Sequence, residues 1–248
     1  PGKMNEATGS NNRVLLFDAD YHLSNDHLFL GLKQPAYLDK IARNTRNLPE
    51  FITATDFGID LISFGGDDKR INSSEVKFNE RVLQELVKIE DCYDWIVVDT
   101  GAGLNQIIIK QIVFADKTVM VVNPDPTSLL DAYKLVKFIS LEKAKPKHIL
   151  VAVNKATSME EAVATFNKLK STVEQFGIRM NLYYAAGFYT DKAVFDTCLV
   201  RGVPAVAAGF DSHFLHSFEL LANNVQQGNL SRKINSFFEN VFLPSGSA

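Results

Sequence analysis

Short apolar, β-branched runs alternate with amphipathic segments along the chain, and this alternation constrains the fold more than any other feature. Most runs are continuously apolar, as expected for strands that are covered on both faces. Strands that alternate with helices predict an α/β fold with a doubly wound, mostly parallel sheet and helices on both faces, in three layers. The predicted strands are Arg13–Phe17, Ile59–Phe64, Trp95–Val98, Thr118–Val122, Ile149–Val153 and Asn181–Ala185.

Helix signals fall between these runs. Asp125-Pro126 is typical of an N-cap followed by proline in the first turn, and it predicts a helix through Ile139. Ser158 and Glu161 have capping-box spacing and predict a second helix, which Gly177 ends. Both segments lie between predicted strands, as a doubly wound sheet requires.

Composition and length narrow the class of protein. The 248 residues are 46% hydrophobic, which excludes intrinsic disorder, and the net charge of −3 gives no global attraction to nucleic acid. Two cysteines without metal-binding spacing fit a reducing compartment, and no apolar run approaches the ~20 residues of a membrane span. We therefore expect a cytoplasmic protein. Its one main domain covers 1–228, with an atypical segment 1–12, and a helix at 229–243 and a tail at 244–248 follow.

Polar residues follow three of the predicted strands. They are Asp18-Ala19-Asp20, Asp99-Thr100-Gly101-Ala102-Gly103 and Asn154-Lys155. Ligands of open parallel sheets bind at the carboxyl ends of strands, and an acidic residue followed by small residues suits a magnesium–nucleotide site. Each aspartate alone could be a helix cap or turn residue. Three such strand ends at one edge favour a functional site.

Three segments resemble the MinD/ParA ATPases, particularly their flagellar-number branch, FlhG/FleN. Residues 18–32 are similar to the family's "DADLGLANVDVLLGL", and residues 93–104 to its "YDxIxIDTxAGI". Residues 124–133 resemble the "xEPTSxTDAY" element of the flagellar branch. The resemblance runs in register from about Arg13 to Val225.

This resemblance implies a site for ATP or ADP with Mg²⁺. Asp20 would lie in switch I near the attacking water, and Asp99 would hold a Mg²⁺-bound water; these are the candidate catalytic residues. The backbone at Gly101 and Gly103, in switch II, would sense the γ-phosphate. Asn154 would contact adenine.

The family's phosphate-binding loop, KGGxGK[ST], is missing. Only Gly2-Lys3-Met4 faintly resembles it, which leaves Lys3 as the candidate phosphate contact. His22 and His27 also replace the usual glycine and aspartate of switch I. Two explanations compete: an ordinary ATPase whose N-terminal portion is absent here or replaced, and a natural pseudo-ATPase. Truncation alone would not alter switch I, and whether the chain is an enzyme stays open.

The C-terminal segment has an apolar face at helical spacing over 230–242. MinD-like ATPases carry a membrane-binding helix in a similar place, so this segment would make peripheral contact with the inner face of the plasma membrane. The alternative is a helix packed on the core or on a twin subunit. His213 and His216 are a weaker candidate pair for a metal, without a third ligand.

Two functions follow from the resemblance. The first is an ATP-dependent switch that dimerises, meets a flagellar GTPase or polar-landmark partner, and regulates flagellar number or placement. The second is a non-hydrolysing scaffold in flagellar, pilus or polar machinery. DNA partitioning is disfavoured because no basic stripe is visible, and we expect no nucleic-acid partner. An upstream KGGxGK[ST] in the complete gene would favour the first function.

Overall fold

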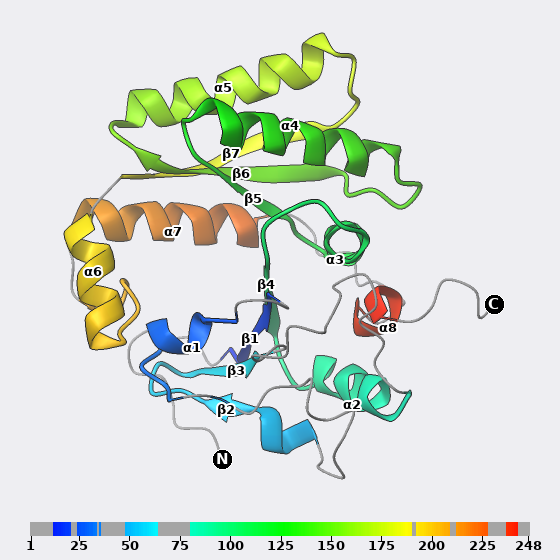
Figure 1. The fold of residues 1–248 in the computed structure, drawn as a ribbon, viewed down its shortest axis with the longest axis vertical. Helices are drawn as coiled ribbons and strands as arrows, with labels where there is room; N and C mark the ends of the chain where they lie inside the picture. The colour runs from blue at the N-terminus through cyan, green and yellow to red at the C-terminus, as the bar shows by residue number, and fades with distance from the viewer. Residues whose placement is uncertain are drawn as a thin grey trace. The chain divides into compact units, whose positions relative to one another are not determined.

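A computed structural model of the chain describes residues 12–20, 24–33, 35, 48–63, 80–189, 192–208, 212–227 and 237–242. The chain divides into two compact units. Unit 1 comprises Pro1–Ile108, Cys198–Ala207 and Ile234–Ala248, and unit 2 comprises Ile109–Thr197 and Ala208–Lys233. Each unit is built on its own sheet (Figure 1).

The sheet of unit 1 has the strand order β2-β3-β1-β4. β1 (Val14–Ala19) pairs in parallel with both β3 (Ile59–Ser63) and β4 (Trp95–Thr100). β2 (Thr53–Ala54) adds a short antiparallel edge next to β3. β1 is therefore the central strand, and its apolar residues form the middle of the core.

Helices of unit 1 complete this core. α2 (Glu80–Glu90) packs against α8 (Phe237–Phe242) and against the 3-10 turn η2 (Leu48–Phe51). Phe238 of α8 is fully buried and meets the ring of Phe17 edge to face, with centroids 5.4 Å apart. The single turn α1 (Asp26–Phe29) follows β1 and contains no buried residue.

Unit 2 contains a parallel sheet of β5 (Val119–Val122), β6 (His148–Ala156) and β7 (Asn181–Tyr189), in that order. In Figure 1, α4 (Pro126–Leu141) and α5 (Met159–Gln175) cover one face of this sheet and α7 (Ser212–Gln226) covers the other. Side chains of α7 pack on the core of Ala152, Ala186 and Phe188. Two shorter helices, α3 (Gln106–Phe114) and α6 (Lys192–Arg201), have residues in both units.

The predicted helix caps are present in unit 2. Oδ1 of Asp125 accepts a hydrogen bond from the Ser128 backbone N–H (2.8 Å), and the Ser158 hydroxyl accepts one from that of Glu161 (3.2 Å). The capping box differs in its second half: the Glu161 carboxylate accepts from the N–H and hydroxyl of Thr157, one residue before the cap. A longer reach back suits a carboxylate on a flexible stem.

The predicted α/β class is confirmed, and the predicted strands all form. The structure differs in detail, because the strands fall into two described sheets and β2 is antiparallel. β1, β4, β6 and β7 also run beyond their predicted ends, so Asp18 and Asp99 lie within strands rather than after them. No helix among the described residues is long and apolar enough to cross a membrane.

Candidate functional site

Four aspartates gather where β1 and β4 end in unit 1. Asp18 and Asp99 are direct neighbours in the parallel register of these strands, so their side chains share one end of the sheet. Asp20 follows β1 by one residue, and Asp26 begins α1. The predicted meeting of the first two strand ends is therefore confirmed.

Asp18 is the structural anchor of this cluster. It is only 2% exposed, and its two carboxyl oxygens accept hydrogen bonds from the backbone N–H groups of Asp20 (3.2 Å) and Asp26 (3.3 Å). Burial raises the pKa of Asp18 to about 6, against the lowering effect of these hydrogen bonds. One side chain thus fixes both the residue after β1 and the first residue of α1.

Asp26 and Asp99 form the electrostatically crowded part of the cluster. Burial, followed by the charges of Asp99, Asp18 and Asp20, raises the pKa of Asp26 to about 8. The pKa of Asp99 is also raised, first by partial burial, although its surface stays accessible. The two carboxyl groups are close enough to influence each other's pKa, and a proton on Asp26 relieves the repulsion between them. The cluster therefore holds fewer than four negative charges at neutral pH.

Gly101 allows Asp20 to approach the backbone after β4. A Cβ at Gly101 would lie 3.1 Å from both Cγ and Oδ1 of Asp20, closer than most side chains tolerate. Gly103 has a φ of +110°, in the region that favours glycine, and has open space around it. The 101–103 segment thus leaves its backbone uncovered beside the Asp20 carboxylate.

The remaining predicted site residues belong to unit 2 or lie outside the described residues. Asn154 is in unit 2, inside a bulge of β6, where its Oδ1 accepts a hydrogen bond from the Lys155 backbone N–H (2.9 Å). Lys155 has a φ of 58°, which is uncommon for a residue with a side chain. Lys3 and His22 lie outside the described residues. Within unit 1, the structure brings together Asp20, Asp99 and Gly101.

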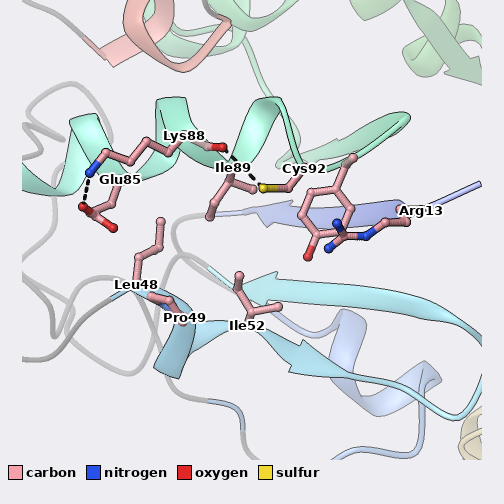
Figure 2. A pocket seen from close by; sticks show the side chains of 9 residues that line it. Arg13, Leu48, Pro49, Ile52, Glu85, Lys88, Ile89 and Cys92 are labelled. Atoms are coloured by element: carbon pink, nitrogen blue, oxygen red, sulfur yellow. Dashed lines mark hydrogen bonds and ion pairs between the residues drawn. The ribbon is translucent and has the colours of Figure 1, made fainter. Parts of the chain in front are cut away.

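A pocket of about 230 Å³ lies near the opposite edge of the unit 1 sheet (Figure 2). Its lining includes Arg13 and Tyr93, which precede β1 and β4, whereas the aspartates lie at the other ends of these strands. The Arg13 guanidinium stacks over the Tyr93 ring at 4.9 Å, and Lys88 pairs with Glu85 (2.8 Å). Ligands of open α/β sheets bind at the carboxyl ends of strands. The aspartate cluster is therefore the better candidate site.

Comparisons with known proteins agree with this geometry. The chain is 27% identical to the antiactivator FleN of Pseudomonas aeruginosa over 183 residues, which are 73% of this chain and 64% of FleN. It is 31% identical over 179 residues to the flagellum site-determining protein YlxH of Helicobacter pylori, covering 69% of this chain and 58% of YlxH. The chain belongs to the MinD/ParA superfamily. Both relatives are flagellar proteins, and the chain spans about six-tenths of their length.

Solved structures of this superfamily share the fold. A ParA family ATPase from Chlorobium tepidum superposes with a TM-score of 0.67 at 16% identity, covering 88% of this chain and 87% of the other. MinD from Pyrococcus horikoshii, solved in complex with Mg-ADP, gives a TM-score of 0.66 at 20% identity over 87% and 84% of the two chains. No family model matches the chain.

Members of the MinD/ParA superfamily bind ATP or ADP with Mg²⁺, and the aspartate cluster fits the metal part of such a site. Asp99 and Asp20 offer hard carboxylate oxygens of the kind that Mg²⁺ prefers. Burial first, and then the neighbouring carboxylates, raise the pKa values of Asp26 and Asp99, and a cation would offset both effects. Among the described residues, no group of three or more potential ligands could hold a metal directly. Coordination through water by Asp99, as the family resemblance implies, is compatible with both facts.

Sequence reasoning missed the role of Asp26. It stands where the MinD/ParA segment "DADLGLANVDVLLGL" has a valine. This difference from the family pattern could have been noticed in the sequence, directly before that of His27. The Oδ2 atom of Asp26 and the Nδ1 atom of His27 are buried without a hydrogen-bond partner among the described residues. Burial also lowers the pKa of His27, which favours the neutral imidazole. Two polar substitutions therefore sit side by side in this switch I segment.

Two weaker sequence candidates are only partly covered by the structure. Of the apolar segment 230–242, the described part is α8, in which Phe238 and Val241 are buried in unit 1. This supports the packed alternative for these two residues. His216 lies 3.9 Å from Glu219, and the side chain of His213 lies outside the described residues.

Proposed function

We propose that the chain is a nucleotide-dependent switch ATPase of the MinD/FlhG type that regulates flagellar number or placement. The observation that carries this proposal is the convergence of Asp20, Asp99 and Gly101 at the carboxyl ends of β1 and β4. The flagellar relatives FleN and YlxH support the process, and the MinD and ParA structures support the fold.

Each residue of the site has a distinct proposed role. Asp99 holds the Mg²⁺ ion through a water molecule, and Asp20 orients the water that attacks the γ-phosphate. The uncovered backbone at Gly101 and Gly103 senses that phosphate, and Asn154 of unit 2 reads adenine. Mg²⁺ supplies the positive charge that phosphoryl transfer requires. Lys3 is the proposed phosphate contact at the N-terminal end.

The alternative is a non-hydrolysing scaffold in flagellar, pilus or polar machinery. One observation favours it: the Asp26 carboxyl lies within the electrostatic reach of Asp99, at a position where the MinD/ParA segment has valine. An aspartate with such a neighbour binds a metal-bound water less readily. The scaffold would keep the fold and its protein-binding faces without turnover.

Partners and location are part of the proposal. The chain would act as a homodimer and would meet a flagellar GTPase or a polar-landmark protein in the cytoplasm. Contact with the inner face of the plasma membrane would use the 230–242 segment. Because Phe238 is packed against Phe17, that contact would require α8 to leave the core of unit 1.

Calorimetric titration of the 248-residue chain with ATP and ADP, with and without Mg²⁺, tests the nucleotide site. We expect micromolar, Mg²⁺-dependent binding that Asp99→Asn weakens at least about tenfold, since one charge-assisted contact is worth roughly 1.5–3 kcal/mol. Asp91→Asn is the matched control, because Asp91 is an exposed aspartate just before β4. No binding at millimolar nucleotide would refute the switch.

Phosphate release separates the switch from the scaffold. For the switch, Asp20→Asn should lower the hydrolysis rate about a hundredfold or more while nucleotide affinity stays within about threefold, because water positioning acts in the transition state. For the scaffold, the unaltered chain should bind nucleotide without release above the buffer rate, and Asp20→Asn should change nothing.

A further inference from the structure

Two helices end within unit 1 in the same kind of glycine turn. Gly31, with φ +64°, ends α1, where its own N–H donates to the Leu28 carbonyl (3.2 Å) and the next N–H donates to that of His27 (2.9 Å). Gly202, with φ +60°, ends α6, where the Val203 N–H donates to the Cys198 carbonyl (3.1 Å). Both turns have the hydrogen-bond pattern of a glycine C-cap.

These two turns are in direct backbone contact. A Cβ at Gly31 would lie 2.6 Å from the carbonyl oxygen of Gly202. A Cβ at Gly202 would overlap the Cα of Gly31 and lie 2.9 Å from its nitrogen and 3.4 Å from the Leu28 carbonyl oxygen. Neither position has room for a side chain, because the obstacle in each case is backbone. The contact joins segments that are 171 positions apart (202 − 31) in the sequence.

α1 is held at both of its ends. It is a single turn that contacts β3 and contains no fully buried residue. Its N-terminal end is held where the Asp26 N–H donates to Asp18 (3.3 Å), and its C-terminal end is held where Gly31 meets Gly202. The Asp26 carboxyl beside Asp99 moves with whatever moves α1.

We propose that Gly202 and Gly31 are positioning residues: their cap-to-cap contact fixes α1 and thereby places Asp26 against Asp99 at the nucleotide site. The part of this inference that concerns catalysis rests on the proposed switch function. Through this contact, the position of the 198–207 segment affects the position of switch I. A shift of that segment changes the acidic cluster without touching any of its aspartates.

The first experiment measures hydrogen exchange of the nucleotide-free chain by mass spectrometry. Gly202→Ala should accelerate exchange in peptides that cover 24–32. The matched control is Gly177→Ala, because Gly177 has a similar φ of +68° but a Cβ added there would meet nothing within 4 Å. Both variants force alanine into a left-handed conformation, and only Gly202→Ala adds the clash. Equal exchange of 24–32 in the two variants would overturn the contact as the anchor of α1.

Native-state exchange of the unaltered chain covers the case in which Gly202→Ala does not fold. With increasing urea, the amides of Leu32 and Val203, which close the two caps, should lose protection together as one cooperative unit. Separate opening of the two amides would contradict the proposal.

Turnover tests the positioning role itself. If the switch function holds, Gly202→Ala should lower the ATP hydrolysis rate about tenfold or more, since small displacements in an active site cost one to two orders of magnitude. Gly177→Ala should keep the wild-type rate. A wild-type rate in Gly202→Ala would overturn the positioning role. Absence of turnover in the unaltered chain would instead count against the switch and leave the exchange result to decide the contact.

Discussion

The two units of the molecule treat their polar groups in opposite ways. Unit 2 uses aspartate and serine at helix ends, where Asp125 and Ser158 satisfy backbone N–H groups. Unit 1 gathers four aspartates at the end of its sheet, where Oδ2 of Asp26 is buried without a hydrogen-bond partner among the described residues. Aspartate therefore caps a helix in unit 2, whereas in unit 1 it lies among other carboxyl groups.

This difference indicates where function resides. Buried, unpaired polar atoms and like charges in contact cost stability, and folded chains retain them mainly where a ligand will use them. The capped helices of unit 2 show no such cost at their ends. Unit 1 thus has the features of a site that a cation would complete. Each of the following variants tests one side of this contrast.

The largest effect should come from the apolar core of unit 1. Phe238→Ala should lower the free energy of unfolding by about 3–5 kcal/mol, because it removes a fully buried ring that packs on Phe17. Urea unfolding measures this. Phe176→Ala, at a 65% exposed ring, is the control and should cost much less. A small effect of Phe238→Ala would mean that α8 is not docked in solution, which would favour the membrane-binding alternative.

Removing the charge at Asp26 should stabilise the chain. The pKa of Asp26 is about 8 in the folded chain against an ordinary 3.8, so the folded state holds the proton more tightly and stability falls as pH rises between these values. Asp26→Asn should therefore gain about 1–2 kcal/mol at pH 8 and little at pH 4, without Mg²⁺. Thermal unfolding across this pH range gives the comparison, with Asp91→Asn as the pH-insensitive control. If Asp26→Asn were less stable than the unaltered chain at pH 8, the unfavourable burial of the Asp26 charge among its neighbours would be refuted.

The same kind of change in unit 2 should have the opposite sign. Asp125→Ala should cost about 1 kcal/mol, because the Ser128 N–H loses its partner and α4 loses its N-cap. The cost should be present at pH 8, where Asp26→Asn is beneficial. Chemical unfolding at this one pH sets the two variants side by side. If both variants stabilise the chain, the contrast between the units fails.

The smallest effect should come from a surface ion pair of unit 2. Lys134 and Asp131 are 3.0 Å apart on α4, and both side chains are more than half exposed. Asp131→Ala should change stability by less than about 0.5 kcal/mol, and added salt should remove the difference. A larger effect would point to a role of Asp131 beyond the pair.

Local patterns predicted most of the fold. Continuous apolar runs gave the strands, and the Asp125 and Ser158 caps with Gly177 gave the bounds of two helices nearly to the residue. The short strand β2 and the turn η2 escaped prediction because elements of so few residues are too short to show a periodic pattern. Whether the strands form one sheet or two depends on contacts between distant segments, which periodicity does not encode.

The site was predictable only in part for the same reason. Asp18, Asp20 and Asp99 could be placed together, because parallel strands end at one edge. The sequence does not reveal that Asp26 lies against Asp99, since that depends on how a one-turn helix is held. Nor does it reveal that Gly31 meets Gly202. These long-range relations set the charge and geometry of the cluster.

The packing of Phe238 on Phe17 also bears on how the chain folds as it is synthesised. The two rings are separated by 221 positions (238 − 17), so the core of unit 1 is incomplete until α8 has left the ribosome. Unit 2 also needs a late segment, because α7 ends at Gln226, 11 positions before α8 begins (237 − 226). Contacts of such long range are slow to form, and domains fold as their own segments become available. We expect both units to become resistant to proteolysis only after α7 and α8 have been made, so the aspartate cluster of unit 1 is enclosed late in synthesis.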